Sequence, residues 1–329
     1  GVMEGSVKKR LPVEYEDFKK IIDNDRYYVD KTMLIYDLLC GSAKNTLIVR
    51  PDGFGKTLNF SMLRYFFDIT EKENAYLFDR LEISEHYAEL EEYRNAYPVI
   101  ALSLGCHGRA DEILTVKDVC REIMCQFKKY SFILEGDKVT TIYRARFQRI
   151  LNCDEIEERI FIGSLKLLSE CLKQYYNKKV IVLVDDYAGW ISERCDSDRS
   201  EIIERFVNTL LEDVLKTNLA LAFSVMTGCY GISNKSEITG LNNVKTYGTS
   251  NVRYSKYFGF VQQEAEDMLR YYGMEEACDR VKHNCYVLEC GKEELYKSSD
   301  IIQCVKTDIM MNESTENNKK SHSECSGDI

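Results

Sequence analysis

A lysine and a threonine follow a glycine-containing turn near residue 50, in the order Gly55-Lys56-Thr57. The turn comes directly after a β-prone apolar run, Thr46–Val49, and an amphipathic stretch begins at Lys56. A loop between a strand and a helix can bind phosphate, because backbone N–H groups and the amino end of the helix surround the anion. The sequence therefore predicts a phosphate-binding P-loop.

Each residue of this loop has a predicted role. Lys56 would neutralise charge on the β- and γ-phosphates of a nucleotide, and the Thr57 hydroxyl would hold Mg²⁺. Backbone N–H groups for the phosphates would come from Gly53, Phe54 and Gly55. One position departs from the usual pattern, because Arg50 stands where a P-loop normally has its first glycine.

Two carboxylates follow a second apolar run. The continuous aliphatic stretch Val180–Val184 ends in Asp185-Asp186, which is the form of a Walker B element. We predict that Asp185 holds Mg²⁺ and that Asp186 orients the attacking water. The alternative is that both carboxylates simply leave the sheet and cap a turn. A charge at the end of a buried apolar strand needs compensation by a cation or by hydrogen bonds. The presence of Gly55-Lys56-Thr57 upstream in an α/β frame favours the metal site over the alternative.

A third polar group ends another apolar stretch. Thr227 follows Leu219–Met226 and would lie near the γ-phosphate as a catalytic or sensing residue. Its alternative role is to satisfy the local backbone with its hydroxyl. Of the aromatic residues upstream, Tyr27 or Tyr28 is a candidate for contact with the adenine base, and the alternative for both is the core.

The elements that must position these groups alternate along the chain. Strand patterns lie at 46–49, 98–104, 179–184, 219–226 and 244–247, and helical patterns at 56–67, 116–129, 156–176 and 200–216. This alternation predicts an α/β fold with a parallel sheet flanked by helices, of the P-loop NTPase type. Because ligands bind at the carboxyl ends of such strands, the loop, the two carboxylates and Thr227 are expected to meet.

The domain organisation follows from the same patterns. We expect a helical lead-in over residues 1–44, the P-loop NTPase-like core over 45–255 and a small helical appendage over 256–305. Residues 306–329 are rich in Ser, Asn, Lys and Glu with few apolar residues, so a disordered polar tail is expected there.

Composition limits the classes of partner. The net charge of −10 disfavours broad nucleic-acid binding, which depends on phosphate neutralisation. A local basic stretch at Arg144, Arg146 and Arg149 is interpreted as a solvated helix face. No apolar run is long enough for a membrane span, and no secretory signal is visible at the start. Thirteen scattered cysteines fit reduced thiols, so a cytoplasmic protein is expected.

The order of these elements resembles the AAA-ATPase-like domain family, a group of mostly bacterial proteins, many with a restriction-nuclease-like C-terminal region. The resemblance covers about Leu11 to Asp300. It is carried by Leu11-Pro12-Val13 with Asp17-Phe18, Tyr27-Tyr28-Val29-Asp30-Lys31-Thr32, Phe54-Gly55-Lys56-Thr57-Leu58-Asn59, Val180–Asp186 with Tyr187, Thr227-Gly228, Gly240-Leu241-Asn242-Asn243 and Tyr257-Phe258-Gly259-Phe260. The family loop reads R-P-R-R-F-G-K-T, so Arg50 follows the family pattern.

Four departures from the family concern the same site. Asp52 and Gly53 replace two arginines of the loop, and Asp185-Asp186-Tyr187-Ala188 replaces D-E-Y-D. Cys229-Tyr230-Gly231-Ile232 follows Thr227-Gly228 where the family commonly has an arginine, as in T-G-I-L-R-I. The stretch around His283–Cys290 also lacks the family's W-Y-D-G-Y-like pattern, and a nuclease-like region is not expected in residues 1–329.

These departures alter the catalytic and charge-stabilising positions, while the residues that define the fold are kept. The resemblance therefore implies a nucleotide-binding protein with ATP and Mg²⁺ as cofactors, in which hydrolysis is impaired. The alternative is a nucleotide-free pseudo-ATPase that serves as a protein-interaction scaffold. A protein partner or a homo-oligomer fits both, whereas nucleic acid and membrane are not expected as partners.

Overall fold

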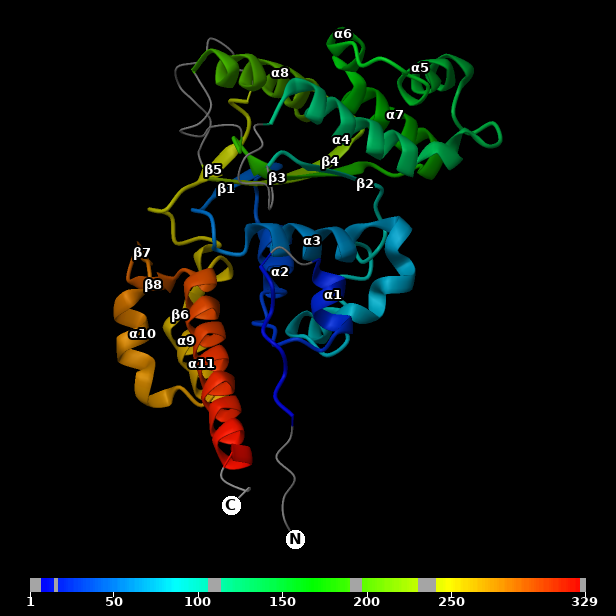
Figure 1. Cartoon of the computed structure of the whole chain (residues 1–329). Coiled ribbons are helices and arrows are strands. Elements are labelled where there is room, and N and C mark those ends of the chain that lie inside the picture. The colour runs from blue at the N-terminus through cyan, green and yellow to red at the C-terminus, as the bar shows by residue number, and fades with distance from the viewer. Residues whose placement is uncertain (1–6, 15–16, 106–113, 190–196, 230–240, 326–329) are drawn as a thin grey trace.

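The computed structural model describes residues 7–14, 17–105, 114–189, 197–229 and 241–325. Its centre is a five-stranded sheet in which all neighbouring strands are parallel (Figure 1). The strands lie in the order β2 (Val99–Ser103), β3 (Val180–Tyr187), β4 (Leu221–Gly228), β1 (Asn45–Val49) and β5 (Lys245–Tyr247). The predicted α/β fold with a parallel sheet is confirmed.

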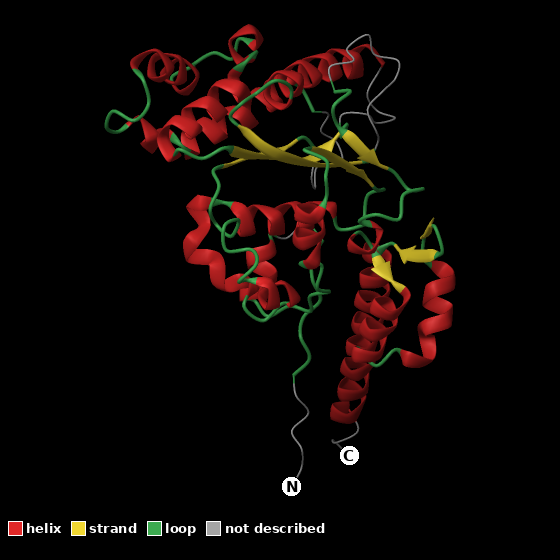
Figure 2. Ribbon diagram, turned by 180° about the vertical axis from the view of Figure 1, so that it is seen from behind, coloured by secondary structure: helices red, strands yellow, loops and turns green. Residues whose placement is uncertain are grey.

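Helices cover both faces of this sheet (Figures 1 and 2). One face carries α4 (Val116–Lys129), α5 (Thr141–Leu151), α6 (Glu158–Phe161), α7 (Ser164–Tyr176) and α8 (Ser197–Leu215). The other carries α1 (Phe18–Asp23), α2 (Met33–Cys40) and α3 (Lys56–Phe67). Short 3₁₀ helices complete the fold at η1 (Ile69–Phe78), η2 (Glu82–His86), η3 (Ser131–Leu134), η4 (Ser255–Tyr257) and η5 (Glu275–Ala277).

The aliphatic run of β3 explains this double coverage. Side chains alternate between the faces of a strand, so Val180, Val182 and Val184 join one core while Ile181 and Leu183 join the other. All five side chains are fully buried. Burial of each side chain stabilises the folded state by about 1.5–3 kcal/mol. Only a strand that is covered on both faces has this contribution at every position.

The C-terminal appendage contains strands as well as helices. A three-stranded antiparallel sheet in the order β6 (Phe260–Val261), β8 (Glu293–Tyr296) and β7 (Val287–Cys290) packs with α9 (Gln262–Tyr271), α10 (Cys278–Asn284) and α11 (Ser298–Cys325). The helical part of the appendage agrees with expectation, and the small sheet is an addition to it.

Two elements differ from the sequence patterns. The helical pattern at 156–176 is divided, because Gly163 adopts φ +79° between α6 and α7. Residues 306–325 continue α11 instead of forming a disordered tail. The first turns of α11 are fixed by the buried side chains of Ile301 and Val305. A helix with a fixed first turn extends easily through polar residues, because each added residue gains a hydrogen bond. The proposed division at residues 45, 256 and 306 stays a prediction.

The lead-in segment joins the appendage through Lys31. Its ammonium donates to Glu264 Oε1 of α9 at 2.6 Å and to the Lys256 carbonyl at 2.7 Å. Burial lowers the pKa of Lys31, while Glu264 acts in the opposite direction. This ion pair therefore joins the lead-in to α9 of the appendage. Among the described residues, no helix has both the length and the apolar character that a membrane span requires.

Candidate functional site

The loop between β1 and α3 depends on two glycines. Gly53 has φ +86° and Gly55 has φ +79°, a region that favours glycine. A Cβ atom at Gly53 would lie 2.3 Å from Cε of Lys297, so the flexible lysine side chain would have to move to make room for it. The loop then enters α3 directly at Lys56.

The appendage binds this loop through its carbonyl groups. The Ser298 hydroxyl donates to the Gly53 carbonyl at 2.8 Å, and the Ser299 N–H donates to the same oxygen at 3.2 Å. The Gly259 N–H donates to the Phe54 carbonyl at 2.9 Å. The Phe54 ring is fully buried and anchors the loop from the same side. The carbonyl groups of Gly53 and Phe54 therefore already accept hydrogen bonds from the appendage.

Lys56 is buried at the centre of a polar cluster. Its ammonium donates to the Arg50 carbonyl at 2.8 Å and to Asp52 Oδ1 at 3.1 Å, and it lies 2.8 Å from the sulfur of Cys229. A carboxylate oxygen of Asp186 is 3.8 Å away. The lysine predicted to neutralise phosphate thus lies among acidic groups of the chain itself.

The charges of this cluster perturb one another. Burial alone would lower the pKa of Lys56, but Cys229, Asp186 and Asp52 outweigh it and the pKa is raised. Burial raises the pKa of the Cys229 thiol to about 12, against the opposing effect of Lys56. At neutral pH the cluster therefore holds an ammonium and a neutral thiol beside the carboxyl groups of Asp52 and Asp186. Its oxygen and sulfur ligand atoms lie within 4.8 Å of one another, and the ammonium lies close to all three.

Three predicted residues meet beside this cluster. The Thr57 hydroxyl donates to Asp185 Oδ2 at 2.9 Å, and the Thr227 hydroxyl donates to Asp185 Oδ1 at 3.1 Å. This follows from the strand order, because β4 lies between β1 and β3 and Thr227 is in register with Ile48. Asp185 is 1% exposed, so the two hydroxyls supply part of the compensation that its charge needs. The structure brings the three together, and their roles stay predictions.

Asp186 occupies a strained turn at the end of β3. It has φ +59°, and Ala188 has φ +65°. The register between β3 and β4 shifts between Val184 and Tyr187, so the side chain of Asp186 is turned toward Lys56. The Tyr187 hydroxyl donates to Asn208 Oδ1 at 2.7 Å, which ties the turn to α8. A non-glycine residue in this region costs about 1–3 kcal/mol, and such positions are concentrated at functional sites.

Arg50 stands where the usual loop has its first glycine, and its side chain has structural contacts. Its side chain is fully buried, and Nη1 donates to the carbonyls of Val49 at 2.7 Å and Gly248 at 3.2 Å. Within the described part of the chain, Nε and Nη2 have no hydrogen-bond partner. Burial lowers the pKa of this guanidinium. The side chain therefore joins the start of the loop to the segment after β5.

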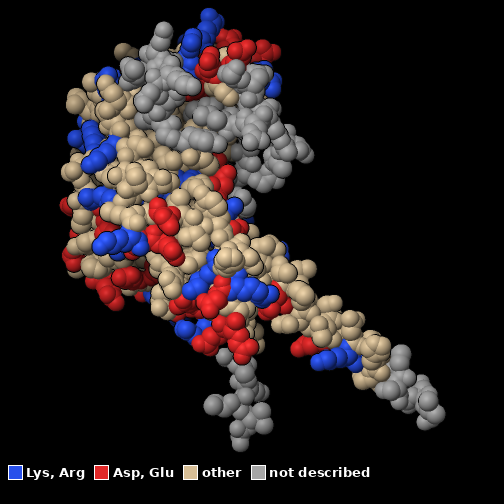
Figure 3. Space-filling view, turned by 90° about the vertical axis from the view of Figure 1, so that its left-hand side faces the viewer, with Lys and Arg blue, Asp and Glu red and all other residues tan. Residues whose placement is uncertain are grey.

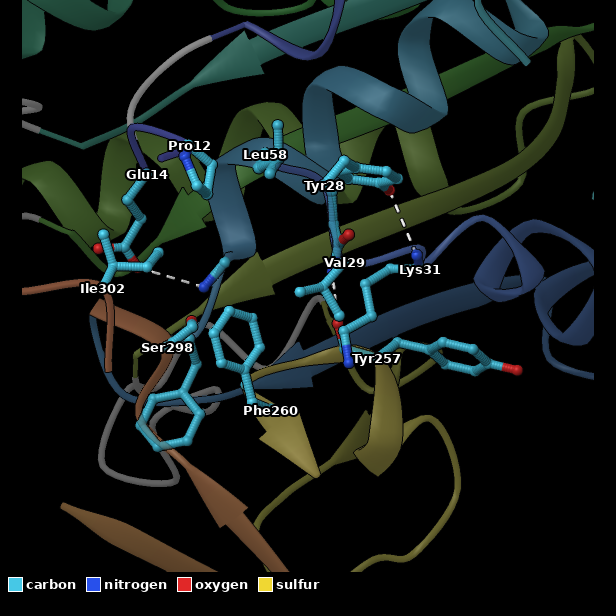
Figure 4. Close-up of a pocket in the computed structure, with 14 residues that line it drawn as sticks. Pro12, Glu14, Tyr28, Val29, Lys31, Leu58, Tyr257, Phe260, Ser298 and Ile302 are labelled. Carbon is cyan, nitrogen blue, oxygen red and sulfur yellow. Dashed lines mark hydrogen bonds between the residues drawn. The ribbon is translucent and has the colours of Figure 1, made fainter. Parts of the chain in front are cut away.

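A pocket opens beside the loop (Figure 4). It encloses about 480 Å³ between the atoms, open solvent at its mouth included. Most of its wall is apolar, and its lining residues come from the lead-in, from α3 and from the appendage: Pro12, Glu14, Tyr28, Val29, Lys31, Phe54, Gly55, Leu58, Asn59, Tyr257, Gly259, Phe260, Ser298 and Ile302. The pocket therefore forms only because three separate parts of the chain meet.

The pocket distinguishes the two tyrosines that were candidates for base contact. Tyr28 lines the pocket, and its hydroxyl oxygen accepts the Lys31 N–H at 3.3 Å. Tyr27 packs instead against Tyr271 and Tyr272, with ring centroids 5.0 and 5.8 Å away. Tyr27 thus belongs to the core of the appendage.

Sequence reasoning missed Glu14 and did not foresee the contacts of Cys229. The carboxylate of Glu14 accepts the Gly55 N–H at 3.3 Å, so it lies beside an N–H group that is predicted to bind phosphate (Figure 4). No local pattern predicts a contact across 41 residues. For Cys229 the only signal was its place directly after Thr227-Gly228. Gly231 and Gly240, which entered the family comparison, lie outside the described residues.

The surface charge pattern is mixed. On the face drawn in Figure 3, Lys and Arg are interspersed with Asp and Glu, without a broad region of one sign. In the basic stretch of α5, Arg146 and Arg149 are exposed, whereas Arg144 donates to the Val139 carbonyl at 3.3 Å. The Arg146 guanidinium lies 5.9 Å from the centroid of the Tyr143 ring, so at least two of the three arginines have contacts within the chain.

Comparison with known proteins gives two matches. A family model described as "Predicted AAA-ATPase" matches residues 12–239. The chain is also 25% identical, over 275 residues, to a protein of Azotobacter chroococcum mcd 1 named "Uncharacterized protein in vnfD 5'region". That alignment covers 79% of this chain and 44% of the relative, so the chain spans less than half of the relative's length. No solved structure matches.

Proposed function

Because the chain belongs to the AAA-ATPase-like family, we propose that it binds ATP at the loop between β1 and α3. The observation that carries the proposal is the setting of Lys56, a buried ammonium at the start of a 12-residue helix. A cation is unfavourable at the amino end of a helix unless an anion lies beside it. The carboxylates of Asp52 and Asp186 fill that role here, and nucleotide phosphates would take it over.

Magnesium fits the neighbouring groups. Mg²⁺ prefers hard oxygen ligands, and Thr57 and Asp185 present a hydroxyl and a buried carboxylate in contact with each other. These two residues would hold the ion, which would supply charge neutralisation at the phosphates. Thr227 holds the other oxygen of Asp185 and so fixes the carboxylate orientation. Cys229 is a poor ligand for Mg²⁺, since sulfur suits softer metals.

The pocket beside Gly55 is the proposed site of the nucleoside. It begins at the loop, and its wall combines aromatic and aliphatic side chains with a few polar groups. Such a lining is typical of small-molecule sites. Tyr28 and Tyr257 would contact the base, while Asn59 is already engaged with the Tyr257 carbonyl at 2.8 Å.

Hydrolysis is proposed to be impaired. Asp186 is the residue expected to orient water, yet its carboxylate faces Lys56 and lies 3.8 Å from the Cys229 sulfur. It is also one methylene shorter than glutamate, and a displacement of about 1 Å at a reacting group costs roughly 100-fold in rate. The second candidate is a nucleotide-free scaffold. It is favoured by the same cluster, because Lys56 already has acidic partners.

Binding is tested by titration of ATP with and without Mg²⁺, comparing wild type with Lys56→Met. The variant should bind ATP about 10- to 100-fold more weakly, because it loses a hydrogen bond to a charged group, and such a bond contributes about this much to affinity. Lys44→Met is the matched control, since Lys44 is exposed before β1. Absence of saturable binding by the wild type at millimolar ATP would favour the scaffold.

Hydrolysis is tested separately in a variant that binds ATP. Asp186→Glu combined with Gly231→Arg restores the residue types of the family and should raise turnover. An unchanged turnover, with ATP binding retained, would refute erosion of these positions as the cause. A protein partner or a homo-oligomer remains part of the proposal.

A further inference from the structure

Glu14 brings a negative charge to an N–H group that is predicted to bind phosphate. Its carboxylate accepts the Gly55 N–H at 3.3 Å, although the two residues are 41 positions apart. Gly55 is the residue directly before α3, and α3 has no capping side chain of its own. The carboxylate therefore lies where the N–H groups of a helix start attract an anion (Figure 4).

The surroundings of Glu14 are those of an anion site. Lys297 and Lys56 act on it with favourable charge, and Asp52 acts with unfavourable charge. Burial raises the pKa of the Glu14 carboxyl, and the Gly55 hydrogen bond opposes that effect. A partly buried carboxylate at this place has a cost in solvation, and the loop N–H and the two lysines offset it. A nucleotide phosphate would need the same groups.

We propose that Glu14 is an internal occupant of the phosphate subsite, which a nucleotide must displace in order to bind. The inference rests on the proposed function, since it names a competitor at the same loop. Glu14 thereby weakens the binding of every ligand that places a phosphate at Gly55. Because Glu14 also lines the pocket proposed for the nucleoside, a ligand that has phosphates and no base is needed to isolate its effect on phosphate.

The alternative role of Glu14 is purely structural, as a distant cap for α3. The two roles predict opposite effects on affinity. If Glu14 is a cap, its removal destabilises the loop and weakens ATP binding. If Glu14 is a competitor, its neutralisation strengthens binding even where the protein loses some stability.

The test compares wild type, Glu14→Gln and Glu14→Ala by calorimetric titration with ATP and with inorganic tripolyphosphate. Glu14→Gln keeps an acceptor of the same length without the charge, and Glu14→Ala removes both. Charge-assisted hydrogen bonds are about twice as strong as neutral ones, so about tenfold tighter binding of both ligands is expected for Glu14→Gln. Glu289→Gln, an exposed position on β7, controls for the change in net charge.

The outcomes separate the two proposals. About tenfold tighter binding of ATP and of tripolyphosphate by Glu14→Gln, and not by Glu289→Gln, supports the inference. Equal or weaker binding by the Glu14 variants overturns the inference, while ATP binding by the wild type preserves the proposed function. Tighter binding of ATP alone overturns it too, since the effect would then lie at the nucleoside. No binding of either ligand by any variant overturns both proposals.

Discussion

Replacement of Lys56 by methionine tests the polar cluster independently of any nucleotide. Methionine keeps much of the aliphatic stem, whose packing matters because the side chain is only 5% exposed. The change removes the ammonium from the Arg50 carbonyl and from the carboxylates of Asp52 and Asp186. We expect the nucleotide-free variant to be less stable than wild type by about 2–3 kcal/mol.

The magnitude is a sum of three unequal contributions. A hydrogen bond from a charged donor to the Arg50 carbonyl contributes about 1.5 kcal/mol. The ion pair with Asp186 is long, at 3.8 Å, but the aspartate side chain is only 14% exposed. Its contribution lies between those of surface and buried pairs, at about 1 kcal/mol. The Asp52 side chain is 77% exposed, so solvent screens its pair with Lys56, which adds about 0.5 kcal/mol or less.

The assay is urea unfolding followed by far-UV circular dichroism, without nucleotide. Lys44→Met should stay within about 0.5 kcal/mol of wild type, as exposed positions do. A Lys56→Met protein as stable as wild type would refute the reasoning. A double variant, Lys56→Met with Asp186→Asn, tests whether the two side chains interact. Asp186→Asn should destabilise the wild type by about 1 kcal/mol and leave the Lys56→Met protein unchanged or more stable, whereas simple additivity would show that the two side chains do not interact.

Three further predictions concern the same edge of the sheet. Asp185→Asn should remove the Mg²⁺ dependence of ATP affinity while binding in a chelator persists, and calorimetry that finds an unchanged dependence would contradict the metal role. Ala188→Gly should raise the free energy of unfolding by about 0.5–1 kcal/mol, because φ at Ala188 is +65°; a loss of stability in urea would count against strain at this turn. With its pKa raised to about 12, Cys229 is a thiol below that pH. Its alkylation by iodoacetamide should be slow at neutral pH, and the rate should rise about tenfold per pH unit toward pH 12. Peptide mass spectrometry would measure this rate, with exposed Cys125 as the reference. Alkylation of Cys229 as fast as that of Cys125 at neutral pH would contradict the prediction.

The predictable part of the fold is the part written in local patterns. The aliphatic run Val180–Val184 identified a buried strand because both of its faces are apolar. Helix α4 was predicted at its observed bounds, Val116–Lys129, because its apolar residues recur at helical spacing. Strands β6 to β8 were missed, since segments of two to four residues are too short to show a period.

The site shows the same division. The glycines and Lys56 of the loop follow from a local motif, and the meeting of Thr57 with Asp185 follows from where parallel strands end. The contacts of Glu14 and Cys229 could not be predicted in this way. Glu14 reaches Gly55 only after the lead-in has folded along α3, and Cys229 reaches Lys56 only because β4 separates β1 from β3. Both contacts depend on the topology of the fold, which no local pattern in the sequence shows.

The hydrogen bonds from Ser298 and Ser299 to Gly53 have a mechanical consequence. These serines are the first residues of α11, a continuous helix of 28 residues. A helix of that length extends about 40 Å, so a rotation of about 5° at its base moves its far end by about 3.5 Å. The loop between β1 and α3 therefore lies at the base of this long helix. A change in the loop that tilted the first turn of α11 would therefore displace the far end of this helix by a larger distance (Figure 1).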